Sequence, residues 1–286
     1  MNHSITFKND IEAIGPVSVG SQGVNHQGYI IKDSGESRNT FEDWGLVAKQ
    51  RPYFVPPKQK TNFLEVPGAS YTLDLSESLT GYPVYDDREG SIEFTMLNDI
   101  DKYGEWYSRY SEIMGFLHGH VMRAFLDDDK EYFYEGRFTV DDYSPGDAQG
   151  NPWGKIKIGY KLSPYKWYYL SSIEPWLWDP FNFRTGMILQ ALFQNLILTT
   201  SWQSKNYSDF IGAAPFCPNL IVKTSGGKGA TLRLVNKSLN FDRTRTVPEG
   251  TTILPDFIFY GNDLTFYYKA VSGSGTISVE FYHGRL

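Results

Sequence analysis

Strict alternation of apolar and polar residues recurs along the chain and predicts β-strands with one buried face. In the first half the clearest examples are residues 92–96, 132–140 and 156–162. Near the end, residues 264–270 and 277–281 alternate in the same way, and Ser272-Gly273-Ser274-Gly275 stands between them. Glycines between two alternating runs are typical of a hairpin turn, so we expect these two segments to pair with each other.

One segment has helical periodicity instead. Its apolar residues follow the i, i+3, i+4, i+7 pattern of a helix with one buried face: Tyr103, Trp106, Tyr107, Tyr110, Ile113, Met114 and Leu117. Asn98, Asp99 and Asp101 precede it, where carboxylates suit the helix dipole and side-chain oxygens can cap. Gly119 is placed to end the helix.

The segment after this helix predicts a hairpin with arms Val121–Leu126 and Glu131–Val140 and the acidic turn 127–129. Residues 144–152 are rich in Pro and Gly and predict a long exposed loop. Three prolines around 164–180 bracket an aromatic segment, near which we place a domain boundary. The sequence thus predicts domains at 1–171 and 172–286, mainly β with one α-helix in the first, and a β-sandwich of short strands in the second.

Composition supports two folded domains, since 286 residues are about twice a common domain length. The 20 Tyr, 19 Phe and 7 Trp favour strands and supply flat contact area for interfaces. The formal net charge is −6, and the absence of a long basic run argues against nucleic-acid binding. Met187–Leu198 is too short to span a bilayer, and the N-terminus lacks an apolar core of signal-peptide length. We therefore expect no membrane association and folding in a cytoplasm.

Each residue cluster that could indicate catalysis or ligand binding has a simpler structural explanation. The acidic pairs and triplet at 86–87, 127–129 and 141–142 are expected to be solvated turn residues, although a glycosidase pair needs only carboxylates that meet in space. The histidines, among them His118, His120 and His283, are expected at the surface or at a helix end. Gly226–Gly229 predicts a tight turn before a strand at 231–235. We predict no catalytic residue, metal or cofactor.

Lone Cys217 cannot form an internal disulfide and is expected to be a small buried apolar residue. The aromatic residues near the boundary include Trp167, Trp176 and Trp178. These rings could form a domain interface, a subunit interface or a sugar-stacking platform, and an interface is favoured because rings cover large areas at low entropic cost.

Several segments, in order, resemble the siphophage distal tail protein family. They are Val66-Pro67-Gly68 before Leu73-Asp74-Leu75, Ser91-Ile92-Glu93-Phe94, the helix around Trp106 with Leu117-His118-Gly119, Tyr132-Phe133-Tyr134-Glu135-Gly136-Arg137-Phe138, and Leu162-Ser163-Pro164-Tyr165-Lys166. The resemblance covers residues 41 to 166. In the second half, Phe210–Pro215 and Phe259–Leu264 resemble the galectin-like β-sandwich that often follows in this family. No sugar-binding residue set is matched there.

The resemblance implies a structural protein of the virion tail tip, assembled in the host cytoplasm, and not an enzyme. An N-terminal split-barrel domain would form a homo-hexameric ring that joins the tail tube protein to the tail-tip hub protein around the end of the tape-measure protein. DNA would pass through the lumen without specific binding, and the C-terminal domain would support receptor-binding proteins. The alternatives are a carbohydrate-binding module for host cell-wall sugars and a glycan-degrading enzyme.

A ring needs large contact surfaces between subunits. Residues 28–57 hold Phe41, Trp44, Tyr53 and Phe54 among many polar residues. We therefore expect this segment to form an extended arm or hairpin whose aromatics contact a neighbouring subunit.

Overall fold

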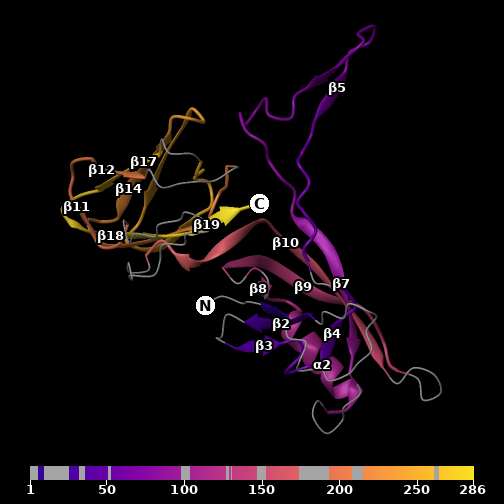
Figure 1. Ribbon diagram of the computed structural model, residues 1–286. Coiled ribbons are helices and arrows are strands. Elements are labelled where there is room, and N and C mark those ends of the chain that lie inside the picture. The colour runs from indigo at the N-terminus through magenta and orange to yellow at the C-terminus, as the bar shows by residue number, and fades with distance from the viewer. Residues whose placement is uncertain are drawn as a thin grey trace. The chain divides into compact units, whose positions relative to one another are not determined.

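The computed structural model describes residues 6–9, 26–31, 36–50, 53–97, 104–126, 129, 131–146, 153–173, 193–207, 215–260 and 264–286. Within these ranges the chain is mainly β with one α-helix, as predicted (Figure 1). It divides into two compact units, Met1–Gln59 with Tyr85–Trp167, and Lys60–Val84 with Tyr168–Leu286. The predicted boundary at residue 172 stays a prediction.

The first unit is built around one large sheet. Its strands are β1 (Thr6–Asn9), β2 (His26–Ile31), β4 (Leu46–Ala48), β7 (Arg88–Met96), β8 (Val121–Leu126), β9 (Tyr132–Ser144) and β10 (Gly154–Ser171). Their order in the sheet is β1-β2-β8-β9-β10-β7-β4, and β19 (Tyr282–Arg285) also pairs with β10. The short strand β3 (Ser37–Asn39) lies beside β2. The predicted hairpin of β8 and β9 is confirmed, and β9 ends four residues later than expected.

The single described helix, α2 (Trp106–Leu117), covers the core of this sheet. Ile113, Phe116 and Leu117 are buried against strand residues that include Phe94 and Met122. Glu105 is the N-cap residue but makes no side-chain capping bond, and the polar residues expected to cap the helix lie outside the described residues. The helix ends as predicted, because the His118 N–H bonds to the Met114 carbonyl and Gly119 takes a φ of 83°.

Residues 58–86 form a long hairpin whose outer part is the two-stranded sheet of β5 (Phe63–Glu65) and β6 (Thr72–Asp74). Backbone hydrogen bonds of 2.8 Å continue the ladder below it, from Asp86 N to Lys58 O and from Lys60 N to Val84 O. The hairpin is seen in violet in Figure 1. Every residue of β5 and β6 is exposed.

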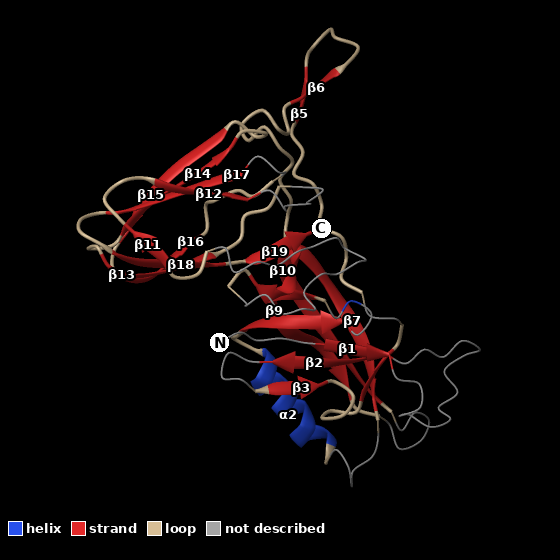
Figure 2. Ribbon diagram, turned by 60° about the vertical axis from the view of Figure 1, so that its left-hand side comes forward, coloured by secondary structure: helices blue, strands red, loops and turns tan. Residues whose placement is uncertain are grey.

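The second unit contains a sandwich of two four-stranded antiparallel sheets (Figure 2). One sheet has the order β11-β18-β13-β16, formed by Leu196–Leu198, Gly275–Glu280, Leu220–Gly226 and Gly250–Leu254. The other has the order β12-β17-β14-β15, formed by Gln203–Tyr207, Leu264–Ala270, Ala230–Asn236 and Phe241–Val247. Alternate residues of these strands, such as Val222, Leu232, Phe266 and Val279, are buried and form the core.

The predicted pairing of the last two long strands is wrong. β17 and β18 lie in different sheets, so residues 271–274 carry the chain from one layer to the other. β17 pairs with β12 and β14, whereas β18 pairs with β11 and β13. Alternation shows that each strand has one buried face, but it does not identify the neighbouring strand.

The turn at 226–229 is confirmed, and it also connects the two sheets. Gly226, Gly227, Lys228 and Gly229 all have positive φ, from 50° to 99°. The Ser272 N–H bonds to the Gly227 carbonyl, and the Val271 N–H bonds to the Gly229 carbonyl. A Cβ at Gly229 would lie 2.1 Å from the Val247 carbonyl oxygen, whereas a Cβ at Gly273, also at positive φ, would meet nothing within 4 Å.

These two glycines make a matched pair for a stability test. Gly273→Ala should lower the free energy of unfolding by about 1 kcal/mol, because it introduces only the positive-φ cost of an L-residue. Gly229→Ala should cost about 3 kcal/mol or more, because it adds a backbone clash to that cost. Urea unfolding of the full chain measures both, and equal losses would contradict the close approach at Gly229.

Candidate functional site

Several carboxylates of the acidic clusters form hydrogen bonds or ion pairs within the described part of the chain. Asp129 pairs with Lys166 at 2.7 Å, Asp141 accepts a hydrogen bond from the Thr139 hydroxyl, and Asp142 accepts one from the Tyr143 N–H. Within the described ranges, no three His, Cys, Asp or Glu residues gather in a way that could hold a metal ion. These carboxylates therefore act as turn and strand-end residues in this part of the chain.

The three histidines whose side chains the structure describes are of two kinds. His118 and His120 are exposed just beyond α2, and the His118 imidazole accepts a hydrogen bond from the Val140 N–H at 2.9 Å. His283 was expected at a surface or helix end, but it is 5% exposed within β19. Burial lowers the pKa of His283 to about 4, with a smaller contribution from Arg285. The side chain is thus neutral in the folded protein near neutral pH.

A buried neutral histidine couples folding to pH. Because the pKa of His283 is about 4 in the folded state against 6.5 ordinarily, the unfolded chain takes up its proton first as pH falls. The contribution of His283 to the free energy of unfolding is therefore fully present above about pH 6.5. It is lost as the pH falls toward 4, by about 3 kcal/mol in all. In urea unfolding from pH 7 to pH 4, His283→Gln should lose less stability than the parent chain. If both proteins lose the same free energy of unfolding between pH 7 and pH 4, the prediction is wrong.

Cys217 was expected to be buried, but the structure places it at the surface as an exposed residue. Phe216 before it is buried instead, stacked on Phe259 at 5.8 Å. Desolvation nevertheless raises the pKa of the Cys217 thiol to about 11. The thiol is protonated at neutral pH, which disfavours it as a nucleophile.

Three of the four aromatics expected at a subunit contact lie in the protein's own core. Trp44 is fully buried and packs edge-on against Phe116, and Phe41 is also buried. Phe54 packs on Tyr134 and other rings. Only Tyr53 of the four is exposed. The first three rings thus contribute to the core of the first unit, and a contact of Tyr53 with a neighbouring subunit stays a prediction.

Of the tryptophans near the predicted boundary, Trp167 is buried in β10 and packs against Tyr165. Trp176 and Trp178 lie outside the described residues. The expectation that these two form an interface or a sugar-stacking platform therefore stays a prediction.

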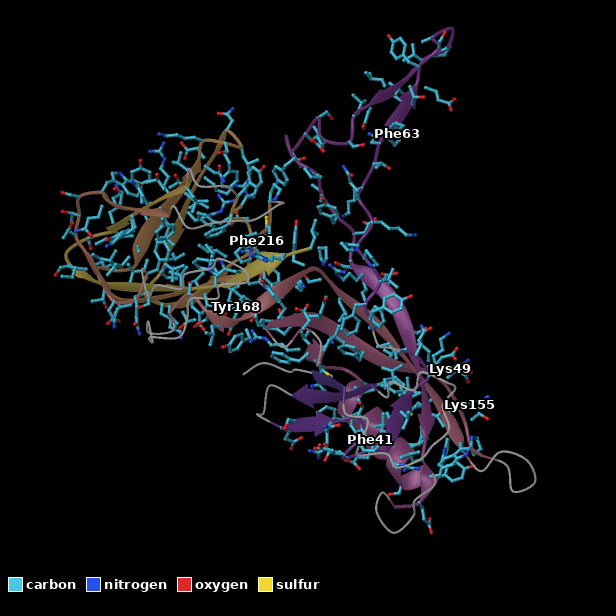
Figure 3. The ribbon with its side chains drawn as sticks, in the orientation of Figure 1. Phe41, Lys49, Phe63, Lys155, Tyr168 and Phe216 are labelled. Carbon is cyan, nitrogen blue, oxygen red and sulfur yellow. The ribbon has the colours of Figure 1, made fainter. Side chains whose placement is uncertain are left out.

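The hairpin at 58–86 exposes large apolar side chains that sequence analysis did not single out. Phe63 is 58% exposed, Tyr71 70% and Leu79 99%, and Leu64, Val66 and Leu73 are exposed as well. Figure 3 labels Phe63 on the hairpin. The alternation of β5 and β6 is too short to separate a buried from a solvated face, so pattern alone could not reveal this surface.

A second surface feature is a cleft of about 310 Å³ on the large sheet. Its lining residues are Lys49, Glu93, Phe94, Thr95, Asp142, Tyr143, Ser144, Lys155, Ile156 and Lys157. Lys49 donates to Glu93 at 2.8 Å and lowers the pKa of that carboxyl, and Lys157 and Lys155 lower it further. Figure 3 labels Lys49 and Lys155 on this part of the sheet.

An aromatic cluster adjoins the cleft through Tyr143. The ring of Tyr143 lies 4.0 Å from Tyr110 and 5.5 Å from Trp106, measured between centroids. Tyr107 packs edge-on against Trp106 and is largely exposed. Rings with one polar edge are favoured at protein contacts, so the cleft and this cluster form a second candidate contact surface.

Among the described residues, no helix has the length and apolar character needed to cross a membrane. No known family profile matches the chain, and no curated protein matches it.

Several solved structures align with this chain over most of its length. One is described as SPP1 Dit (gp 19.1), a paradigm of hub adsorption apparatus in phages that infect Gram-positive bacteria. Its TM-score is 0.46 and its identity 12%, over 87% of this chain and 96% of that chain. Two are chains of the phage P2 baseplate in its activated conformation, with Ca and with Sr. The structure with Ca has a TM-score of 0.37 and an identity of 10%, over 87% of this chain and 94% of that chain. The structure with Sr has a TM-score of 0.36 and an identity of 11%, over 90% of this chain and 98% of that chain. These structural neighbours are thus phage tail and baseplate proteins.

Proposed function

We propose that this chain is a structural subunit of a phage tail tip, a distal tail protein that forms a homo-hexameric ring. In this proposal residues 1–171 form the split-barrel ring domain, and 172–286 form a galectin-like sandwich that supports receptor-binding components. The ring joins the tail tube protein to the hub protein around the tape-measure protein. DNA passes through it without specific binding, and the subunit has no catalytic role.

The first support is the ordered series of family-like segments and the elements they occupy. Ser91–Phe94 lies in β7, Tyr132–Phe138 in β9 and Leu162–Lys166 in β10, and these strands are neighbours in the large sheet. Val66-Pro67-Gly68 lies between β5 and β6, where Gly68 has a φ of 84°. Three of the segments therefore lie in neighbouring strands of one sheet, and a fourth lies in the hairpin.

The observation that carries the proposal is the apolar surface of the hairpin at 58–86. A two-stranded hairpin is marginally stable in water on its own, and contiguous exposed apolar side chains mark a contact site. Six apolar residues of this hairpin are exposed, and its two short strands pair only with each other among the described residues. We infer that the hairpin takes the contact role expected of the arm at 28–57 and packs on a neighbouring subunit.

Polar substitution on the hairpin tests this. A chain with Phe63→Ser, Tyr71→Ser and Leu73→Ser should stay folded but lose the hexamer, because the buried apolar area at each contact is removed. The matched control is Ile197→Ser with Ile253→Ser, which changes exposed apolar residues on the sandwich and should leave the ring intact. Light scattering gives the mass, and negative-stain microscopy gives the sixfold ring.

Two results would overturn the proposal. One is a parent chain that stays monomeric at high concentration. The other is a hairpin variant that assembles as well as the parent chain, since the contact would then lie elsewhere.

A further inference from the structure

The outward face of the sheet β12-β17-β14-β15 is unlike the rest of the sandwich surface. Its register places Ser204, Tyr267, Arg233 and Thr244 in one row across the four strands. The residues between them along β17 and β14, such as Phe266 and Leu232, are buried in the core. The outward set is therefore fixed by the same pairing that builds the core.

Rings and cations alternate across this face. The Lys269 ammonium lies 4.7 Å from the centre of the Trp202 ring, and the Arg233 guanidinium lies 5.7 Å from that of Tyr267. Arg233 also donates to both carboxylate oxygens of Asp242. This bidentate bond holds the guanidinium in place beside the Tyr267 ring. Trp202 is 45% exposed, a large exposure for a tryptophan.

Hydroxyl and amide groups fill the positions around the rings. The Thr231 and Thr246 hydroxyls lie 3.2 Å apart, and the Thr265 hydroxyl donates to the Asn206 side-chain carbonyl at 3.2 Å. Each hydroxyl and the Asn206 amide group keep further hydrogen-bonding capacity. The face thus offers donors and acceptors next to flat apolar rings.

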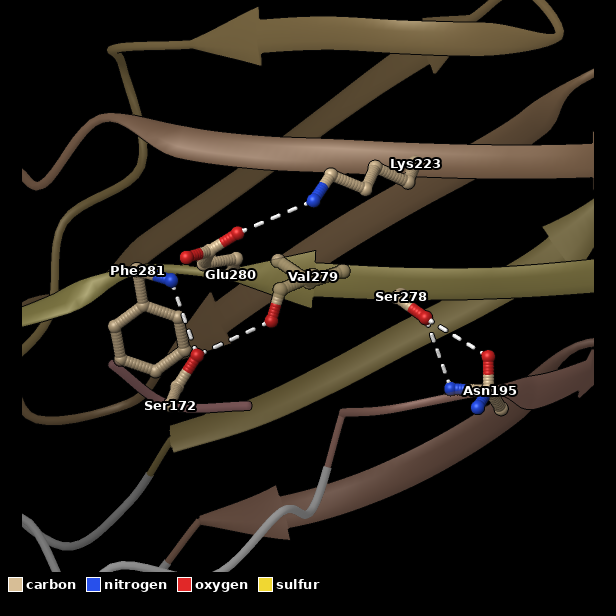
Figure 4. A network of polar contacts seen from close by, with 7 residues as sticks. All are labelled: Ser172, Asn195, Lys223, Ser278, Val279, Glu280 and Phe281. Carbon is tan, nitrogen blue, oxygen red and sulfur yellow. Dashed lines mark hydrogen bonds and ion pairs between the residues drawn. The ribbon is translucent and has the colours of Figure 1, made fainter. Parts of the chain in front are cut away.

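The outward face of the opposite sheet provides a comparison within the same unit. Its exposed apolar residues are aliphatic, Ile197 and Ile253, and its ion pair is Lys223 with Glu280 at 3.4 Å (Figure 4). The register places Thr251, Ser278 and Thr276 at its other outward positions. No aromatic ring is among these described outward residues, so the row of rings and cations is particular to one sheet.

We propose that the face formed by Trp202, Tyr267, Arg233, Lys269 and Asp242 binds a glycan. A sugar ring has an apolar face of C–H groups, which suits stacking on Trp202 and Tyr267, and a rim of hydroxyls, which suits the Arg233–Asp242 pair and Asn206. A protein contact needs a desolvated apolar centre, and this face has no aliphatic patch to supply one. The two cations exceed the single carboxylate, so a neutral or weakly acidic glycan is preferred. The inference does not depend on the ring.

The test uses the full chain and a printed array of bacterial surface polysaccharides. We expect retention of at least one neutral or weakly acidic polysaccharide, whose affinity is then measured by isothermal titration calorimetry. Trp202→Ala and Arg233→Ala should each weaken binding about tenfold or more. The controls Ile253→Ala and Lys223→Ala remove the equivalent exposed apolar residue and ion-pair cation from the opposite sheet, and they should bind as the parent chain does.

Light scattering reports the assembled mass of each variant, and thermal unfolding reports its stability. Together they distinguish a loss of glycan binding from a loss of assembly or folding. An unchanged mass and unfolding temperature for Trp202→Ala, with lost binding, supports the glycan site whether or not the chain forms a ring. Retention of no polysaccharide, or equal binding by Trp202→Ala and the parent chain, overturns it. If Trp202→Ala changes the assembled mass and no polysaccharide is retained, the face is a protein contact and the proposal fails.

Discussion

The antiparallel pairing of β7 with β10 is the constraint on which the first unit depends. Nine consecutive residue pairs join the two strands, from Gly154 opposite Met96 to Leu162 opposite Arg88. Because side chains alternate between faces, this register buries Phe94 and Ile156 and turns the lysines of β10 outward. A slip of one residue would exchange the core with the charged face. The charged cleft is therefore a consequence of the same pairing that forms the core.

The same pair of strands also anchors the long hairpin. Arg88, the first residue of β7, is buried and donates to the Val55 carbonyl before the hairpin and to the Pro164 carbonyl in β10. Its guanidinium lies over the Tyr134 ring, and desolvation lowers its pKa. Burying a cation is costly unless its donors are satisfied, so the bonds to these two carbonyls offset that cost and hold both ends of the hairpin to the sheet.

The two proposed contact surfaces differ in chemistry, and the difference fits their roles. The hairpin presents exposed aliphatic and aromatic side chains, which suit a permanent protein contact. The outward face of β12-β17-β14-β15 presents rings among hydroxyls and a bidentate ion pair. Polar groups on such a face can hydrogen-bond to water at little cost in free energy before a polar ligand binds. One chain can thus combine a fixed place in an assembly with a reversible contact to its surroundings.

Local pattern was sufficient for the features that depend on near neighbours. The helix at Trp106–Leu117, the hairpin of β8 and β9 and the glycine turn at 226–229 were all predicted, because periodicity and turn chemistry act over a few residues. Partners distant in sequence were decided by tertiary packing. β17 and β18 joined different sheets, Trp44 packed inward against Phe116, and His283 was buried while Cys217 was exposed. Pattern tells which side of a strand avoids water, but only the folded chain decides what covers it.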